Sequence, residues 1–271
     1  MKRSGLFWLQ LLFTLGLSLF MVVPVLVSLL AGITENTFIG LKSGLTLRWV
    51  AQVWQMYSDT LWLSLLIAIS CLGCVLVLGV PAAWGLLKAP ARWASRIEEC
   101  LLLPVALPGL ATALGLILIY GGFHALRGSW LFILIGHVLF TLPFMIRPVL
   151  AVMRAGQLLQ LEEAAASLGA GFWRRFFTII VPNCRNGILA GAFMVLTLSI
   201  GEFNITWMLH TPLTKTLPVG LADSYASMRL EVGSAYTLIF LAMILPLLLT
   251  LSWLTQFAQR RARALSDKET V

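Results

Sequence analysis

Six long apolar blocks constrain the fold of this chain more than any other feature of its sequence. They span residues 6–30, 61–87, 101–120, 130–145 (which could extend through 150), 187–209 and 236–257. About twenty apolar residues are enough for a helix to cross the hydrocarbon core of a bilayer. An open chain can satisfy its backbone polar groups in lipid only as helices. The sequence therefore predicts an all-α, multi-pass membrane protein with six transmembrane helices.

The composition supports a membrane solvent and argues against a nucleic-acid partner. Hydrophobic residues make up 59% of the 271 residues, and charged residues only 11%, whereas a soluble domain carries about a quarter charged residues. The formal net charge is +8, but the basic residues lie between the apolar blocks, where they orient the helices. We therefore expect a lipid bilayer as the partner and no nucleic acid.

The distribution of Lys and Arg predicts the topology. Fourteen of the 19 lie in the N-terminus, in residues 88–100 and 146–186, and in the tail after residue 259. The positive-inside rule places these segments and both termini in the cytoplasm, and residues 31–60 and 210–235 outside. The first block is too long for a signal peptide and lacks a cleavage site, so we expect it to be a retained span.

The four cysteines, Cys71, Cys74, Cys100 and Cys184, do not form a convincing metal or redox site. Cys71 and Cys74 make a CxxC inside an apolar block with no nearby His. Zinc binding and thiol redox chemistry need thiolates, which apolar surroundings disfavour. We interpret all four as small packing residues and predict no metal site.

Helix-breaking residues occur in two of the blocks. They free backbone groups, which a solvated transport path or close helix packing through small residues could satisfy, and the sequence does not decide between the two. In the third block they are Pro104, Pro108, Gly109 and Gly115, and in the fourth Pro143 and Pro148.

The segment 146–186 combines a short predicted helix, a turn and an aromatic amphipathic piece. Glu162 and Glu163 are expected at the helix start, where the helix dipole favours negative charge. Gly169 stands where a helix stop needs a left-handed residue. The second piece contains Phe172, Trp173, Phe176 and Phe177, followed by Pro182. One interpretation is an interfacial helix pair with Arg174 and Arg175 on lipid phosphates.

The order of residues in this segment resembles the EAA signature of importer-type ABC transporter permeases. That signature has Glu-Ala-Ala, three residues, Gly, nine residues, Ile, one residue and Leu-Pro. The matching residues here are Glu163, Ala164, Ala165, Gly169, Ile179 and Pro182, and Val181 replaces the usual Leu. The resemblance runs from about residue 61 to the sixth block.

The resemblance implies how the chain works with other subunits. In this family the motif forms a coupling helix in a cleft of the ATPase subunit. The chain has no Walker-type glycine loop, so ATP and Mg are expected on a separate ATPase, and the chain itself is expected to bind no cofactor and not to be an enzyme. The implied partners are two ATPase subunits, a periplasmic solute-binding protein and a second permease, as a heterodimer or alternatively a homodimer, in the bacterial inner (plasma) membrane.

The same resemblance implies a division of the chain into three parts. Residues 1–60 would hold the first transmembrane helix and an outer loop. Residues 61–257 would form a five-helix permease core with the EAA loop at 162–182. Residues 258–271 would be a cytoplasmic tail.

Shorter stretches resemble permeases for polyamines, ferric iron, molybdate, thiamine and phosphonates. They lie at residues 45–49, 104–109, 199–204 and 216–218. They imply a small polar or charged solute, of the polyamine, phosphonate, or metal or oxyanion type.

Glu202, Asn204 and Pro108 are the candidate residues of the translocation path. An ionisable group at membrane depth usually faces a cavity or a partner. Glu202 could meet a cationic part of the solute, or it could sit at the outer water interface or pair with a neighbour. His137 allows the same alternatives, with a buried hydrogen bond between helices favoured. Asp223, Arg229 and Glu231 are expected to meet the binding protein or solvent.

Two other classes of protein remain as alternatives. A secondary transporter or channel would leave the EAA spacing unexplained. A membrane-embedded enzyme would need a cluster of catalytic residues, but His124, His137 and His210 lie far apart without such spacing.

Overall fold

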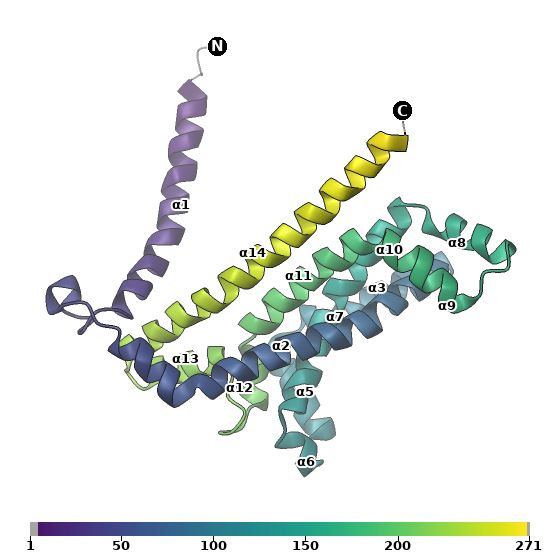
Figure 1. Cartoon of the computed structure of the whole chain (residues 1–271). Coiled ribbons are helices and arrows are strands. Elements are labelled where there is room, and N and C mark those ends of the chain that lie inside the picture. Colours follow the sequence, from purple (N-terminus) through teal and green to yellow (C-terminus); the bar gives the residue numbers. More distant parts are fainter. Residues whose placement is uncertain (1–4, 270–271) are drawn as a thin grey trace. The chain divides into compact units, whose positions relative to one another are not determined.

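The computed structural model describes residues 5–269 and confirms the all-α prediction (Figure 1). Residues 1–4, with two of the basic residues counted for topology, and residues 270–271 at the end of the predicted tail lie outside the described part. Side-chain surroundings are described up to Trp253, apart from Gly5 and Leu251. Apart from an isolated antiparallel bridge between Thr34 and Leu45, the regular structure of residues 5–269 is helical.

The helices follow the order of the predicted blocks. They are α1 (Gly5–Ala31), η1 (Gly40–Ser43), α2 (Arg48–Lys88), α3 (Ala91–Leu101), α4 (Leu103–Ala106), α5 (Gly109–Tyr120), α6 (His124–Arg127), α7 (Trp130–Ala155), α8 (Leu158–Ser167), α9 (Phe172–Arg175), η2 (Phe176–Ile180), α10 (Val181–Asn183), α11 (Arg185–Gly201), α12 (Asn204–Leu209), α13 (Leu217–Ala226) and α14 (Leu230–Glu269).

Four helices of the described chain are long and apolar enough to cross a membrane. They are Leu6–Ala31, Arg48–Lys88, Trp130–Ala155 and Leu230–Thr250. Two bent helix pairs raise the number to six if each pair is one span: Ala91–Ala106 with Gly109–Tyr120, bent by 99°, and Phe172–Asn183 with Arg185–Gly201, bent by 73°. The chain is therefore a polytopic membrane protein.

The expected helix interruptions occur at only some of the candidate breakers. Pro104 lies in the first turn of α4, and Pro108 precedes the first residue of α5, so the third block is broken as predicted. The prediction was wrong for Gly115, Pro143 and Pro148, because α5 and α7 continue through them. Membrane helices tolerate proline where neighbouring groups satisfy the freed backbone, and α7 is the most extensively buried of the candidate spans.

The chain forms two compact units, and the larger one contains residues 60–219 and 244–271. Its core brings together Val75 of α2, Met145 and Val149 of α7, and Val195 of α11. A Cβ added at Gly187 would meet the carbonyl oxygen of Pro148 at 2.7 Å, so α11 lies directly against α7. This pair forms the centre of the unit.

The smaller unit contains residues 1–59 and 220–243. A Cβ at Gly32 would meet backbone atoms of Ser234 at 2.7 Å, so the end of α1 closely approaches α14. The Thr37 N–H donates to Glu231 Oε1 over 2.9 Å, and Arg229 donates to the Tyr57 hydroxyl over 3.0 Å. Arg229 and Glu231, expected to face solvent or a binding protein, therefore hold this unit together.

The cysteines differ in part from the expectation. All four cysteines are free; Cys71 and Cys184 are buried as predicted, but Cys74 and Cys100 are exposed. No group of His, Cys, Asp and Glu within the described residues could hold a metal ion. Helix α14 continues to Glu269, beyond its apolar part, because residues 256–265 are mostly strong helix formers.

Candidate functional site

The EAA segment forms helix α8 and a sharp turn. Gly169 has φ +83°, a conformation that favours glycine. The N–H of Ala170 donates to the carbonyl of Ala165 over 3.0 Å, and that of Gly169 to Ala166 over 2.9 Å, which is the bonding of a glycine-terminated helix end. The predicted helix stop at Gly169 is confirmed.

The motif residues of α8 lie on the outside of the molecule. Glu163, Ala164 and Gly169 are exposed, and Ala165 is half-buried. Leu168, next to the turn, is 89% exposed. This surface combines small side chains, one carboxylate and a protruding leucine, and a partner could approach its backbone closely.

The prediction that Glu162 and Glu163 lie at the start of the helix was wrong. Helix α8 begins at Leu158, so Glu162 and Glu163 are its fifth and sixth residues and do not interact with its N-terminal dipole, which acts over the first turn. The two side chains instead separate: Glu163 is exposed, and Glu162 is 2% exposed.

Glu162 accepts hydrogen bonds from two basic side chains. Lys88, the last residue of α2, donates to Glu162 Oε1 over 2.8 Å. Arg175, the last residue of α9, forms a salt bridge with the same oxygen. Arg175 is therefore not free for lipid phosphates, as the interfacial interpretation had expected. One buried carboxylate oxygen joins three helices.

Aromatic rings pack beside this ion cluster. Trp84, one turn before Lys88 on α2, lies with its ring centroid 4.7 Å from that of Phe172 and 5.3 Å from that of Phe176. The ammonium of Lys88 lies 4.1 Å from the Trp84 ring centroid, a cation–π distance. We call Trp84, Lys88, Glu162, Phe172, Arg175 and Phe176 the Glu162 cluster.

The last two motif residues lie where the chain turns into α11. Ile179 is part of the π-helix η2, and its carbonyl accepts from the Asn183 side chain over 2.7 Å. Pro182 is exposed in the first turn of α10. A π-helical turn often occurs at functional sites, and here it precedes the 73° bend.

Glu202 lies at the other end of α11 and caps the following helix. Its carboxylate accepts the N–H groups of Ile205 over 2.8 Å and Thr206 over 2.9 Å, and the Thr206 hydroxyl over 3.0 Å. It thereby satisfies amides that the start of α12 leaves free. Helix α11 ends at Gly201 and α12 begins at Asn204, so the fifth block is not one continuous helix.

His137 connects α7 to this cap. Its Nδ1 lies 2.9 Å from Ser199 Oγ, and its Nε2 lies 2.8 Å from Thr206 Oγ1 and 3.6 Å from Glu202 Oε2. The prediction of a buried hydrogen bond between helices is confirmed for His137, and Glu202 pairs with its neighbours. We call His137, Ser199, Glu202 and Thr206 the Glu202 cluster.

The structure brings the other candidate path residues together. A Cβ at Gly109, the residue after Pro108, would lie 3.0 Å from Cβ of Asn204, so α5 and α12 approach closely. Pro108 and Asn204 are both exposed, unlike Glu202. Their part in a translocation path stays a prediction.

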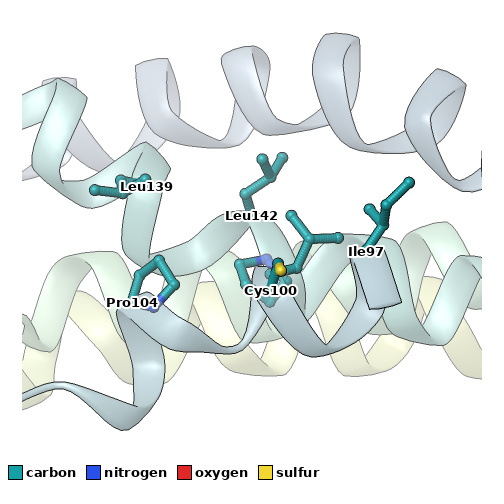
Figure 2. Close-up of a pocket in the computed structure, with 7 residues that line it drawn as sticks. Ile97, Cys100, Pro104, Leu139 and Leu142 are labelled. Carbon is teal, nitrogen blue, oxygen red and sulfur yellow. The ribbon is translucent and has the colours of Figure 1, made fainter. Parts of the chain in front are cut away.

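An apolar cavity of about 240 Å³ lies between α3, α4 and α7 (Figure 2). Its lining residues are Ile97, Cys100, Leu101, Pro104, Leu139, Leu142 and Pro143. The lining contains no charged side chain, so it does not suit a charged solute.

The helical spans define a polytopic membrane protein, and α8 presents an exposed surface. Residues 75–264 match the family described as the binding-protein-dependent transport system inner membrane component, and the chain belongs to this family. It is therefore the permease component of an importer-type transport system.

Individual relatives cover much of the chain. The Molybdenum transport system permease protein ModB of Escherichia coli strain K12 is 30% identical over 200 residues, covering 68% of this chain and 87% of that protein. A protein of Salmonella choleraesuis named as the 2-aminoethylphosphonate transport system permease PhnV is 27% identical, covering 88% and 91%. The Sulfate transport system permease protein CysW of Synechocystis is 29% identical, covering 62% and 66%.

Sequence reasoning missed the inward role of Glu162, its partners Lys88 and Arg175, and the packing of Trp84 beside them. One signal was available: Glu162 follows Leu158 by four residues and shares its helix face, and both are buried. Lys88 lies 74 residues before Glu162 in the sequence, so the sequence alone did not indicate it as a partner.

Proposed function

We propose that this chain is the transmembrane permease subunit of an ATP-driven importer and that α8 is its coupling helix. The observation that carries the proposal is the outer surface of α8, where Glu163 and Ala164 are exposed and Ala165 is half-buried, ended by Gly169 with its positive φ. Close backbone approach needs small side chains, which this surface offers. ATP and Mg would be bound by two copies of a separate ATPase, and a second permease would complete the membrane part.

The same proposal assigns segments of the chain to the two sides of the membrane. The excess of Lys and Arg in residues 88–100 and 146–186 supports a cytoplasmic α8 and cytoplasmic termini. A periplasmic binding protein would deliver the solute to the opposite face. Helix α1 has exposed apolar side chains along its length, which lipid or the second permease would cover.

The solute is proposed to be a small oxyanion or phosphonate. The three relatives described above are named for molybdenum, sulfate and 2-aminoethylphosphonate transport, and molybdate, sulfate and phosphonate are all anions. The proposal is narrower than the solute classes that the short sequence stretches had left open, which included polyamines and ferric iron. Pro108 and Asn204 are the proposed path residues, with Glu202 holding α12 beside them.

A photo-crosslinking residue tests the coupling surface directly. Placed at Ala164, it should attach to the ATPase subunit in the intact complex. The matched control carries it at Met228, which is 76% exposed in the other unit and should attach to no ATPase. Reaction at Met228 but not at Ala164 would contradict the assignment.

Uptake into cells tests the solute. Labelled molybdate, sulfate and 2-aminoethylphosphonate should be compared in a strain that carries the complete system and in one that lacks this permease. Permease-dependent uptake of at least one anion is expected, and spermidine should not compete with it. Permease-dependent uptake of labelled spermidine without uptake of any of the anions would refute the oxyanion class.

A further inference from the structure

We propose that Glu162 is a positioning residue that couples α8 to the second span, α2, through Lys88. The proposal rests on the proposed function, because it assumes that α8 receives the movement of an ATPase. It assigns a role to a residue that faces away from the docking surface, and it names the route by which movement of α8 would reach α2.

The geometry of the cluster supports this route. Oε1 of Glu162 accepts from Lys88 on α2 and from Arg175 on α9. The Glu162 side chain is 3% exposed, compared with 37% for Lys88 and 20% for Arg175. Such an ion pair is screened less by salt than one at the surface. A displacement of α8 therefore acts on Lys88 through a charged hydrogen bond.

Aromatic packing adds a second contact between the same elements. Trp84 and Lys88 lie one turn apart on α2, and Trp84 packs on Phe172 and Phe176 while Lys88 binds Glu162. Two successive turns of α2 are thus held by both helical pieces of the loop. The end of α2 and the loop can move as one body.

The covalent connections of the loop do not include α2. Helix α8 follows α7 through Gly156 and Gln157, and the second piece leads through η2 into α11. Residues 89–157 separate the end of α2 from α8 along the chain. Movement of α8 can pass to α7 and α11 through the backbone, but it reaches the end of α2 through side-chain contacts such as those of Glu162.

The Glu162 cluster contains two cations, Lys88 and Arg175, and one anion, Glu162. This imbalance indicates what a neutral substitution of Glu162 would do. Glu162→Gln keeps the shape of the side chain but leaves Lys88 and Arg175 facing each other without an anion. An unpaired charge in a buried site is strongly disfavoured. Lys88, the more exposed cation, would turn towards solvent, and the link to α2 would open while the exposed surface of α8 persists.

The test is transport by the complete complex carrying Glu162→Gln, reconstituted with its ATPase and loaded binding protein. We expect normal assembly and ATP hydrolysis, and a fall of about tenfold in solute transported per ATP, within the usual range of coupling effects. The matched control is Glu98→Gln, which removes another carboxylate of this unit that is paired with a basic residue, Arg154 at 2.6 Å. It should leave the ratio unchanged.

Two results would overturn the proposal. One is an unchanged ratio of transport to hydrolysis in Glu162→Gln; the other is loss of the ATPase from that complex, which would mean that Glu162 only shapes the docking surface. Lys88→Gln should reproduce the effect, and the double variant should be no worse than either single variant. If the wild-type complex holds no ATPase, the proposed function fails instead, before any variant is compared.

Discussion

The two ends of α11 both change the direction of the chain and both have a buried glutamate nearby, but the glutamates are satisfied in different ways. Near the start of α11, Glu162 is paired with two full positive charges. Beyond its end, Glu202 is held by two backbone N–H groups and a hydroxyl. Figure 1 shows α8 and α12 at opposite ends of α11.

The difference lies in how far along the chain each carboxylate finds its partners. Lys88 is 74 residues from Glu162, whereas Ile205 and Thr206 follow Glu202 by three and four residues. Glu202 therefore stabilises a local helix start, with His137 as its link to α7. Glu162 connects separate helices, so its loss should change how the helices move together more than how any one of them folds.

The largest expected effect comes from the turn at Gly169. A β-branched residue is strongly disfavoured at the φ of +83°, at a cost of about 1–3 kcal/mol, so Gly169→Val should displace α8. Uptake normalised to permease level should fall by at least about tenfold. Gly171→Val is the matched control, because Gly171 has φ −66° and open space around it. Equal uptake by the two variants would show that transport does not depend on the turn at Gly169.

Glu163→Lys should have the next largest effect. Its carboxylate lies on the exposed face of α8, and reversing its charge would repel any cationic group of a docking partner, so uptake should fall by about fivefold or more. Gln160→Lys adds a charge at another exposed position of the same helix and should be nearly neutral. A purely interfacial α8 would tolerate both changes equally, since Lys suits anionic headgroups.

Glu202→Leu should reduce stability more than it changes coupling. It leaves the N–H groups of Ile205 and Thr206 buried without their acceptor, at about 1–3 kcal/mol for each group. Glu202→Gln keeps one carbonyl acceptor and should lose about half as much. Thermal unfolding of the purified protein in detergent measures both. If the two variants unfold at the wild-type temperature, the cap is not a stabilising element.

Gly136→Ala should give the smallest effect. An added Cβ would lie 2.6 Å from Cγ2 of Ile205, so α7 and α12 would have to separate slightly, at a cost of about 1–3 kcal/mol. Gly115→Ala, with nothing within 4 Å, should be neutral or stabilising by about 1 kcal/mol. The unfolding temperatures of the two variants measure this difference. Equal temperatures would contradict the close packing of α7 against α12.

Several features of the candidate site could be predicted because they depend on local chemistry. The turn at Gly169 needs only the intrinsic freedom of glycine, and the buried hydrogen bonds of His137 follow from a polar residue inside an apolar block. Other features depend on contacts with neighbouring helices, which the sequence does not give. Pro143 and Pro148 were expected to interrupt α7, but the helix continues, because the surrounding helices decide whether a proline breaks a membrane helix.

The sequence by itself determined that this chain is a helical membrane protein of the importer permease family, because hydropathy and the EAA spacing are properties of the chain order alone. Only the tertiary structure decided which of two adjacent glutamates turns inward. Glu162 and Glu163 are chemically identical, and helix geometry points them in directions about 100° apart. Which direction is buried depends on where Lys88 and Arg175 arrive, and that follows from the packing of α2 and α9 against α8.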